Sequence, residues 1–285
     1  MDEGDRLRDL WDFDDLDATE VRLRARLDLE ADDAARAEVL TQLARVEGLR
    51  GEFDAGERSI EQAEVLAGDG ATARARIGLE RGRLRRSSGS DEAALPLFGS
   101  AFAIALDARA YFLAADAAHM AALVAPDRSA SAAWTTRGVE LAETHDDARY
   151  WLGPLLNNLG WEYYERGEYE PALDAFERAL RAREEDPANP GAIEIARYAV
   201  GKALRALGRA DQAVPLLERA VTWAEAQGAA DGWFHEELAE EYVAVGREHD
   251  AREQARLAVP LLLDADPSFA DDHDRAARLR ALASD

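Results

Sequence analysis

Apolar and small residues recur with a helical period along most of the chain, and many of the helical stretches end at a glycine. The clearest case is residues 156–180, where Gly160, Ala172 and Phe176 lie on two amphipathic segments separated by Gly167. Small residues let antiparallel helices approach to about 8–10 Å, and a left-handed glycine closes a helix end. The pattern predicts a pair of antiparallel helices. Since no stretch alternates as a strand does, we expect an all-α chain.

The same spacing returns on both sides of this stretch. The large residue of each second helix recurs every 36 to 42 residues, at Ile60, Phe98, Trp134, Phe176, Leu217 and Ala255. Glycines that would end a first helix stand at Gly51, Gly89, Gly167, Gly208 and Gly246. Pro96 and Pro215 follow two of these glycines at some distance, so we expect late starts or small distortions in their helices.

One window identifies the repeat. Its motif positions are Leu159-Gly160, Tyr163, Gly167, Tyr169, Ala172, Phe176 and Ala179-Leu180. This pattern resembles the tetratricopeptide repeat (TPR) family, in its longer-helix variants and in a bacterial or archaeal protein. The resemblance implies a right-handed α-solenoid (superhelix) of about six helix-turn-helix repeats within residues 32–266. The expected repeats are approximately 32–68, 70–106, 108–144, 149–186, 191–228 and 231–265.

Both ends of the repeat array carry segments of a different character. Residues 1–31 are predicted to form an acidic leader and an N-terminal capping helix, with Asp17 and Glu20 as a capping box and the helix ending near Leu29. Residues 267–285 follow a helix-breaking proline and are predicted to form a C-terminal capping helix. Such ends cover the apolar edges that a stack of repeats would otherwise expose.

Charge and composition exclude several classes of protein. The net charge is −24, from 58 acidic and 34 basic residues, so we expect neither nucleic acid nor an anionic membrane as a partner. The chain has no cysteine, which excludes disulfides, zinc–thiolate sites and cysteine nucleophiles. No signal-peptide pattern is visible at the N-terminus, and charges interrupt the most apolar stretch, residues 101–125. We therefore expect a cytoplasmic protein.

Motifs that carry catalysis are missing from the sequence. It contains no phosphate-binding loop, dinucleotide fingerprint, HExxH or G-x-S-x-G. His235 is followed by glutamates, but Ala239 stands where a second metal-binding histidine would be needed. We expect no catalysis, no cofactor and no metal. The alternative is an enzyme site inside the superhelix, built from His119, His235 and nearby glutamates.

The family resemblance also selects candidate binding residues, because in TPR arrays the first helix of each repeat lines the concave groove. The corresponding side chains here are Arg76, Arg83, Arg86, His119, Asn157, Asn158, Trp161, Tyr164, Tyr198, Lys202, Arg205, Glu236 and Glu240. Cations and amides thus gather on one face of an acidic protein, where they could hold a carboxylate and a peptide backbone. The same residues suit packing and ion pairs with neighbours such as Glu80, and this alternative stays open.

The pattern as a whole favours a protein–protein interaction module. It would bind a peptide or a segment of a partner protein in the groove, and a homodimer is compatible with the same architecture. A second hypothesis is a regulatory or sensor protein that controls a partner enzyme or transcription factor. Such an output would reside in the other protein, because this chain carries no DNA-binding or kinase module.

Overall fold

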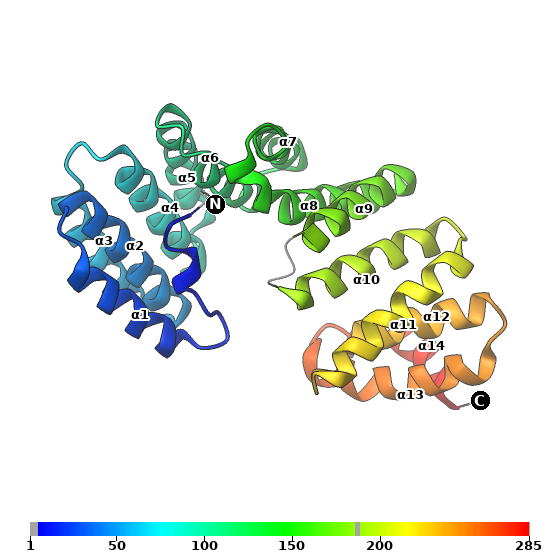
Figure 1. Cartoon of the computed structure of the whole chain (residues 1–285). Helices are drawn as coiled ribbons and strands as arrows, with labels where there is room; N and C mark the ends of the chain where they lie inside the picture. The colour runs from blue at the N-terminus through cyan, green and yellow to red at the C-terminus, as the bar shows by residue number, and fades with distance from the viewer. Residues whose placement is uncertain (1–4, 186–188, 285) are drawn as a thin grey trace. The chain divides into compact units, whose positions relative to one another are not determined.

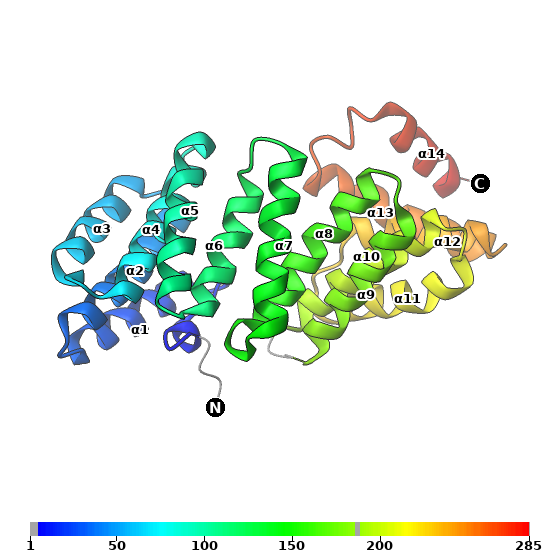
Figure 2. The ribbon, with the colours of Figure 1, turned by 90° about the horizontal axis from the view of Figure 1, so that it is seen from above.

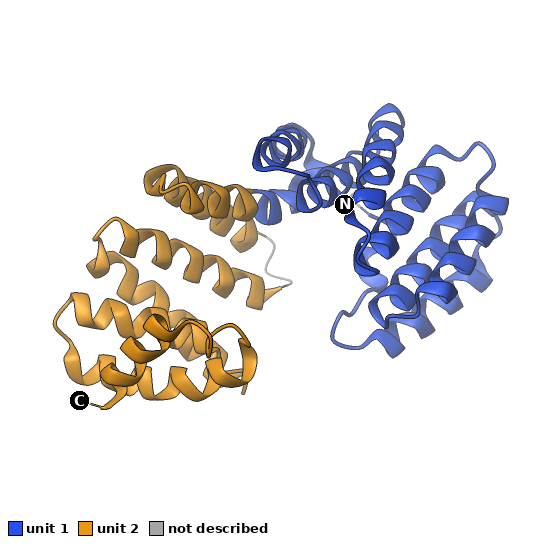
Figure 3. Cartoon of the chain, turned by 180° about the vertical axis from the view of Figure 1, so that it is seen from behind, with its two compact units in different colours: residues 1–155 blue, residues 156–285 orange. Residues whose placement is uncertain are grey.

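A computed structural model describes residues 5–185 and 189–284, which form α-helices, two short 3₁₀ helices and turns, without any β-strand. The prediction of an all-α fold is confirmed, and the chain is a solenoid of helical repeats (Figure 1). It divides into two compact units, Met1–Leu155 (unit 1) and Leu156–Asp285 (unit 2), coloured separately in Figure 3. The division falls inside one helix, α8 (Leu152–Glu165).

Unit 1 is a row of helix pairs (Figure 2). In chain order its elements before α8 are η1 (Arg8–Leu10), α1 (Leu16–Leu29), α2 (Asp33–Leu49), α3 (Phe53–Ala67), α4 (Ala71–Ser87), α5 (Asp91–Asp107), α6 (Tyr111–Leu123), α7 (Arg128–Thr144) and η2 (Asp146–Trp151). Helix α2 packs against α3, α4 against α5 and α6 against α7, while α1 packs on α2. The first helices of these pairs are also neighbours, because α4 contacts both α2 and α6.

Unit 2 continues the same architecture. After α8 its elements are α9 (Tyr169–Glu185), α10 (Pro190–Ala206), α11 (Ala210–Ala226), α12 (Gly232–Ala244), α13 (Glu248–Ala265) and α14 (His273–Ser284). Helix α10 packs against α9 and α11, and α12 packs against α11 and α13. The last helix, α14, covers α13 and buries Ala276 and Leu279 in a cluster with Phe269 and Leu262.

Close approach of paired helices explains the recurring small residues. The rings of Phe98 and Phe176 are fully buried, and each faces a glycine of the preceding helix, Gly82 or Gly160. A Cβ atom at either glycine would overlap the facing ring. Dense packing leaves these positions no room for a side chain.

Glycine also ends the first helices where the sequence predicts it. The five glycines with this role, all with φ between 70° and 81°, are Gly51, Gly89, Gly167, Gly208 and Gly246. A residue with a Cβ is disfavoured in this left-handed region, so glycine terminates the helix with little strain.

The predicted capping box at the start of α1 is wrong by two residues. The helix begins at Leu16, and the carboxylate of Asp15 caps it by accepting a hydrogen bond from the Ala18 N–H at 2.8 Å. Asp17 already lies in the first turn, and Glu20 pairs with Arg50. Asp15 and Asp17 stand on either side of Leu16, and aspartate suits an N-cap at either position, so the sequence did not distinguish them.

The expected late helix starts are also not observed. Helices α5 and α11 begin at Asp91 and Ala210, ahead of Pro96 and Pro215. Each proline removes one hydrogen bond and frees one carbonyl near the helix start. Both prolines are exposed, so water can satisfy the freed carbonyl and the helix continues.

Candidate functional site

Three of the predicted binding residues line one pocket in unit 1. Arg83, Arg86 and His119 border a pocket of about 280 Å³ between α2, α4 and α6. The remaining lining residues are Arg45, Gly48, Leu49, Glu80, Leu84, Ser87, Met120 and Leu123. We call this the cation pocket, because three arginines from two neighbouring first helices converge on it.

Arg83 is the fixed cation of the pocket. Its guanidinium donates hydrogen bonds to the carboxylates of Glu80 and Asp116, both of which are buried. Burial alone would lower the pKa of Arg83, but the charges of Asp116 and Glu80 more than offset this and raise it. Arg83 therefore holds the helices α4 and α6 together and stays charged.

Arg45 and Arg86 are placed differently. In residues 5–185 and 189–284 neither forms an ion pair, and Arg86 is exposed at the end of α4. The guanidinium of Arg45 lies over the ring of Trp11 at 5.0 Å and over that of Phe13 at 5.3 Å. Burial lowers the pKa of Arg45, and repulsion from Arg83 lowers it further. The charges of Glu80 and Asp116 act on the pKa of Arg45 in the opposite direction, but neither Arg45 nor Arg86 has a carboxylate at ion-pair distance among the described residues.

Glu80 adds an unused hydrogen-bond acceptor. Its side chain is only 1% exposed, and one oxygen accepts from Arg83 while the other, Oε2, has no partner among the described residues. A buried acceptor without a donor is costly, at about 1–3 kcal/mol. The cation pocket thus combines arginines, the buried carboxylate of Glu80 with one oxygen unpaired among the described residues, and an apolar wall of Leu49, Leu84, Met120 and Leu123.

Five further predicted residues meet in unit 2. Tyr198, Lys202, Arg205, Glu236 and Glu240 line a pocket of about 430 Å³, together with Trp233, Glu237, Arg275 and Arg278. Glu237, 2% exposed, is its centre: it accepts hydrogen bonds from Lys202 Nζ at 3.2 Å and from Arg205 Nη2 at 3.2 Å.

The remaining charges of this second pocket are also paired internally. Arg278 of α14 donates to Glu240 at 2.7 Å, and Arg275 donates to Glu236 at 2.7 Å. The cations and carboxylates of the unit 2 pocket therefore neutralise one another.

The four predicted residues of α8 line neither of these pockets. Trp161 packs edge-on against Phe176, with 5.1 Å between ring centroids, and against Tyr164 at 5.6 Å. Asn157 and Asn158 are half-buried, and the Oδ1 atom of Asn157 is buried without a partner in the described part of the chain. Packing accounts for Trp161, whereas Asn157 retains an open acceptor.

Arg76 is occupied by the chain itself. Its side chain is 4% exposed and donates hydrogen bonds to Glu38 at 3.3 Å and to Asp5. A partner would have to displace Asp5 before it could reach this arginine.

The histidines occupy separate environments. His119 belongs to unit 1 and His235 to unit 2. His235 is buried, its Nδ1 atom lies 2.7 Å from Gln254 Oε1, and its Nε2 atom lies 3.9 Å from Glu225 Oε1. On the first two turns of α13, side chains of His249, Asp250 and Glu253 lie close enough to share an ion, but they are mostly exposed and Asp250 is paired with Arg247.

Sequence comparison assigns the repeats. Two stretches, residues 154–186 and 195–227, match models described as tetratricopeptide repeat. The helix pairs and the glycine turns of the structure continue the same pattern on both sides. The chain is a tetratricopeptide repeat protein. No curated protein matches its sequence. Within the described residues no helix has the length and apolar character needed to cross a membrane.

Solved structures share the fold of this TPR protein at low sequence identity. BtubC (BKLC) from P. vanneervenii is 18% identical, with a TM-score of 0.61 over 79% of this chain and 93% of that chain. PH0952 from Pyrococcus horikoshii, a STAND protein with a tetratricopeptide repeat sensor, is 15% identical, with a TM-score of 0.71 over 94% of this chain and 42% of that one. The apo form of RapI is 13% identical, with a TM-score of 0.64 over 94% and 76%.

The TPR register explains which pocket residues the sequence reasoning missed. Side chains 38 residues apart meet between α2 and α4, as Glu38 does with Arg76 and Gln42 with Glu80. Shifting Arg83 back by one repeat leads to Arg45, so the repeat period contained the signal for this third arginine. Arg275 and Arg278 of α14 gave no such signal, because α14 lies beyond the last predicted repeat.

Proposed function

We propose that this TPR protein binds a segment of another protein along the first-helix face of unit 1, and that the cation pocket holds an anionic group of that segment. One observation carries the proposal. In a chain with net charge −24, the side chains of Arg45, Arg83 and Arg86 converge on a single pocket. Such a local reversal of charge favours and orients an acidic ligand.

The chemistry of the pocket defines the ligand more closely. Arg83 already carries two carboxylates, so Arg86 at the rim and Arg45 beside it are the cations left for a ligand. Arginine holds carboxylates through paired, charge-assisted hydrogen bonds. The apolar wall adjoining these arginines suits one aliphatic or aromatic side chain, and Met120 can adapt to its shape.

The unpaired oxygen of Glu80 is the third feature of the pocket that a ligand could use. An N–H group of a bound segment would satisfy Oε2, which is buried and has no partner in the described residues. The best ligand is therefore a short stretch with an apolar side chain beside a carboxylate, either an acidic residue or a chain terminus. About 280 Å³ holds one or two residues of it.

A regulatory role is the second candidate. PH0952, whose fold is similar, is described as containing a tetratricopeptide repeat sensor. A sensor would use the same face to receive a partner segment, and the output would belong to that partner. Protein recognition is thus common to both candidates. We retain the exclusion of nucleic acid and anionic membranes as a proposal, because the net charge opposes both.

The experiment uses the full chain as bait for a random peptide library. Selected peptides are then measured by fluorescence anisotropy against the wild type and an Arg86→Ala/His119→Ala variant. We expect the variant to bind about 10-fold or more weakly, since hydrogen bonds to charged groups are worth about 1.5–3 kcal/mol.

A matched control separates the pocket from general charge effects. Arg58→Ala removes an exposed arginine of α3, outside the cation pocket. The control should bind like the wild type. Unchanged affinity of the Arg86→Ala/His119→Ala variant, with unchanged helicity, would contradict the proposed site.

A further inference from the structure

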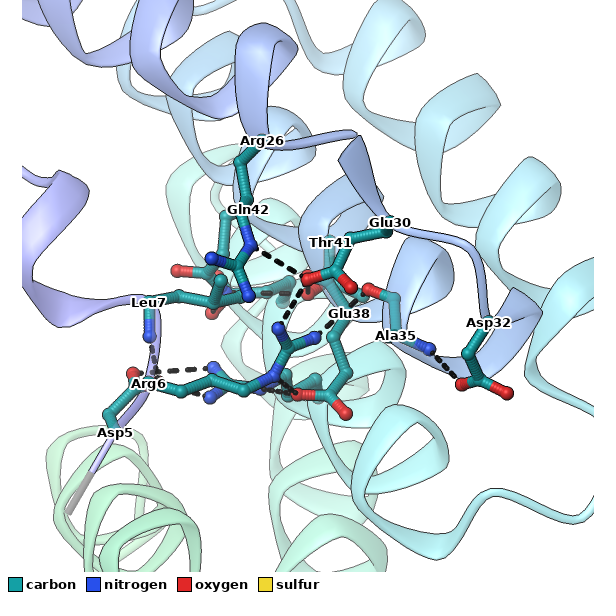
Figure 4. A network of polar contacts seen from close by, with 12 residues as sticks. Asp5, Arg6, Leu7, Arg26, Glu30, Asp32, Ala35, Glu38, Thr41 and Gln42 are labelled. Carbon is teal, nitrogen blue, oxygen red and sulfur yellow. Dashed lines mark hydrogen bonds and ion pairs between the residues drawn. The ribbon is translucent and has the colours of Figure 1, made fainter. Parts of the chain in front are cut away.

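The segment Asp5–Phe13, which we call the leader, begins beside α2, where Arg6 lies next to Glu38 and Ala35 (Figure 4). Asp5 accepts hydrogen bonds from Arg76 of α4. The guanidinium of Arg6 donates to Glu38 of α2 at 3.2 Å. Two successive leader residues thus engage two neighbouring first helices.

The leader extends its contacts beyond α2 and α4. The guanidinium of Arg8 lies 3.9 Å from the ring centroid of Tyr150 in η2. A segment that merely capped the first repeat would need contacts to α1 and α2 alone. This one spans side chains from α2 to η2, as an extended ligand of a repeat array would.

Apolar and aromatic side chains anchor the same segment. Leu7 is fully buried in the cluster under α2. The indole Nε1–H of Trp11 donates to Gln42 Oε1 at 3.0 Å, and Trp11 stacks on Phe13 with 4.9 Å between centroids. Both rings face Arg45, one of the arginines of the cation pocket.

Side chains make the contacts to α2, α4 and η2 named above. The backbone hydrogen bonds of the leader stay within it or go to α1. Arg8 N donates to Asp5 O and Trp11 N to Arg8 O, while Leu10 O accepts from Arg22 Nε at 2.9 Å and Asp12 N donates to Thr19 Oγ1 at 2.8 Å. The leader therefore resembles a docked peptide, and another segment with matching side chains could take its place.

We propose that the surface of α2 and α4 beneath the leader is a binding site for a partner segment with the leader's own pattern, and that the leader competes with this partner. The pattern is an acidic residue, an arginine and a leucine in succession, with an aromatic residue four positions after the leucine. The inference rests on the proposed function, because the aromatic end of the leader covers Arg45 at the cation pocket. It adds that the site is closed by the chain itself until a partner displaces the leader.

The arithmetic of competition gives the expected effect. An intramolecular segment acts at a high effective concentration, and an external ligand sees only the fraction of molecules whose site is open. If the leader is docked in about nine molecules of ten, the apparent affinity falls about 10-fold. Releasing the leader should restore the full affinity for the external ligand.

The test uses a fluorescent peptide with the sequence of residues 5–15 of this chain. Its binding to the full chain is compared with binding to an Asp5→Ala/Arg6→Ala variant, in which the leader has lost its contacts to Arg76 and Glu38. We expect about 10-fold tighter binding to the variant. Asp9→Ala, at an exposed leader residue, should behave like the wild type. Adding Glu38→Ala to the opened variant should weaken peptide binding again.

Hydrogen exchange at Leu10 and Trp11 verifies that the leader has been released. If these amides stay protected in the Asp5→Ala/Arg6→Ala variant, a Leu7→Asp variant is used in its place. A charged residue cannot occupy the buried position of Leu7, so this change should release the leader. Equal binding to closed and opened chains, or binding to neither, would overturn the inference and leave the leader as a fixed cap. The Arg86 and His119 test changes residues of α4 and α6 that line the cation pocket, whereas the leader contacts named above go to other residues, so failure of one proposal is distinguishable from failure of the other.

Discussion

The carboxylate of Asp5 accepts hydrogen bonds from the guanidinium of Arg76, 71 residues further along the chain, and both side chains are nearly buried. Arg76 thus has a partner within the chain, although its place in the repeat marks it as a binding residue. Whether this face is open to a partner therefore depends on the stability of the contact between Asp5 and Arg76.

Replacing Asp5 should loosen unit 1. In Asp5→Asn the buried charge of Arg76 keeps Glu38 alone as its ionic partner among the described residues. We expect the free energy of opening around the leader to fall by about 1–3 kcal/mol. Native-state hydrogen exchange at Trp11 measures this directly. Asp14→Asn, at an exposed position nearby, is the control and should leave exchange unchanged.

Because paired helices approach closely, alanine substitutions at two glycines of unit 1 should change the stability of the protein in opposite directions. Gly82→Ala puts a Cβ against the buried ring of Phe98 and should destabilise the protein by about 1–3 kcal/mol. Gly99→Ala meets only Trp134, at 3.9 Å, and should stabilise it by about 0.5–1 kcal/mol through helix propensity. Urea denaturation of both variants checks the pair. A similar shift of both midpoints in one direction would refute the packing explanation.

A buried carboxylate in unit 2 predicts a pH dependence. Glu241 is fully buried without a hydrogen-bond partner among the described residues; burial, and secondarily the charge of Glu237, raise its pKa to about 7. In the unfolded chain the ordinary pKa is 4.5. A raised pKa in the folded state means that protonated Glu241 contributes to the free energy of unfolding. This contribution is fully present below pH 4.5 and is lost as the pH rises toward 7.

Glu241→Gln should remove this loss, because an amide does not ionise. We expect the variant to match the wild type near pH 4.5 and to exceed its free energy of unfolding by about 3 kcal/mol near pH 8. Denaturation curves at the two pH values test this. Glu253→Gln, on the exposed surface of α13, should show no such gain. A constant difference at both pH values would argue against titration of Glu241.

The pairing of Lys202 and Arg205 with one carboxylate gives a further test of stability. Glu237→Ala leaves both cations without their shared acceptor and should cost about 2–4 kcal/mol. Glu237→Gln keeps an acceptor and should cost less. The ordering of the two denaturation midpoints is the measurement. Equal losses would mean that the carboxylate charge alone, and not the loss of an acceptor, sets the cost.

The fold could be predicted because its determinants are local. Gly167 ends a helix through its own φ angle of 74°, and Gly160 faces Phe176 within one pair. Such features recur with the repeat, so the sequence alone reveals them. The N-cap of α1 was misplaced because Asp15 and Asp17 are the same residue type. Their backbone conformations distinguish them, and the local sequence pattern does not reveal those conformations.

The site was only partly predictable, because its character depends on pairs distant in the sequence. The position of each residue within its repeat selected Arg83, Arg86 and His119, and these three residues do line one pocket. It could not show that Asp5 occupies Arg76 or that Glu237 neutralises Lys202, since side-chain partners lie one or more repeats away. Charge pairing between helices thus decides which predicted cations remain for a ligand.

The most direct test of the account is to map which face contacts the partner. A photo-crosslinking amino acid is placed in the full chain either at Leu123, which lines the cation pocket on α6, or at Val65, which is exposed on α3 outside it. Both are irradiated in native extract. We predict a crosslinked partner from position 123 that is lost on adding Arg86→Ala, and none from position 65. Equal yields from both positions, or a partner from position 65 alone, would contradict binding along the first-helix face.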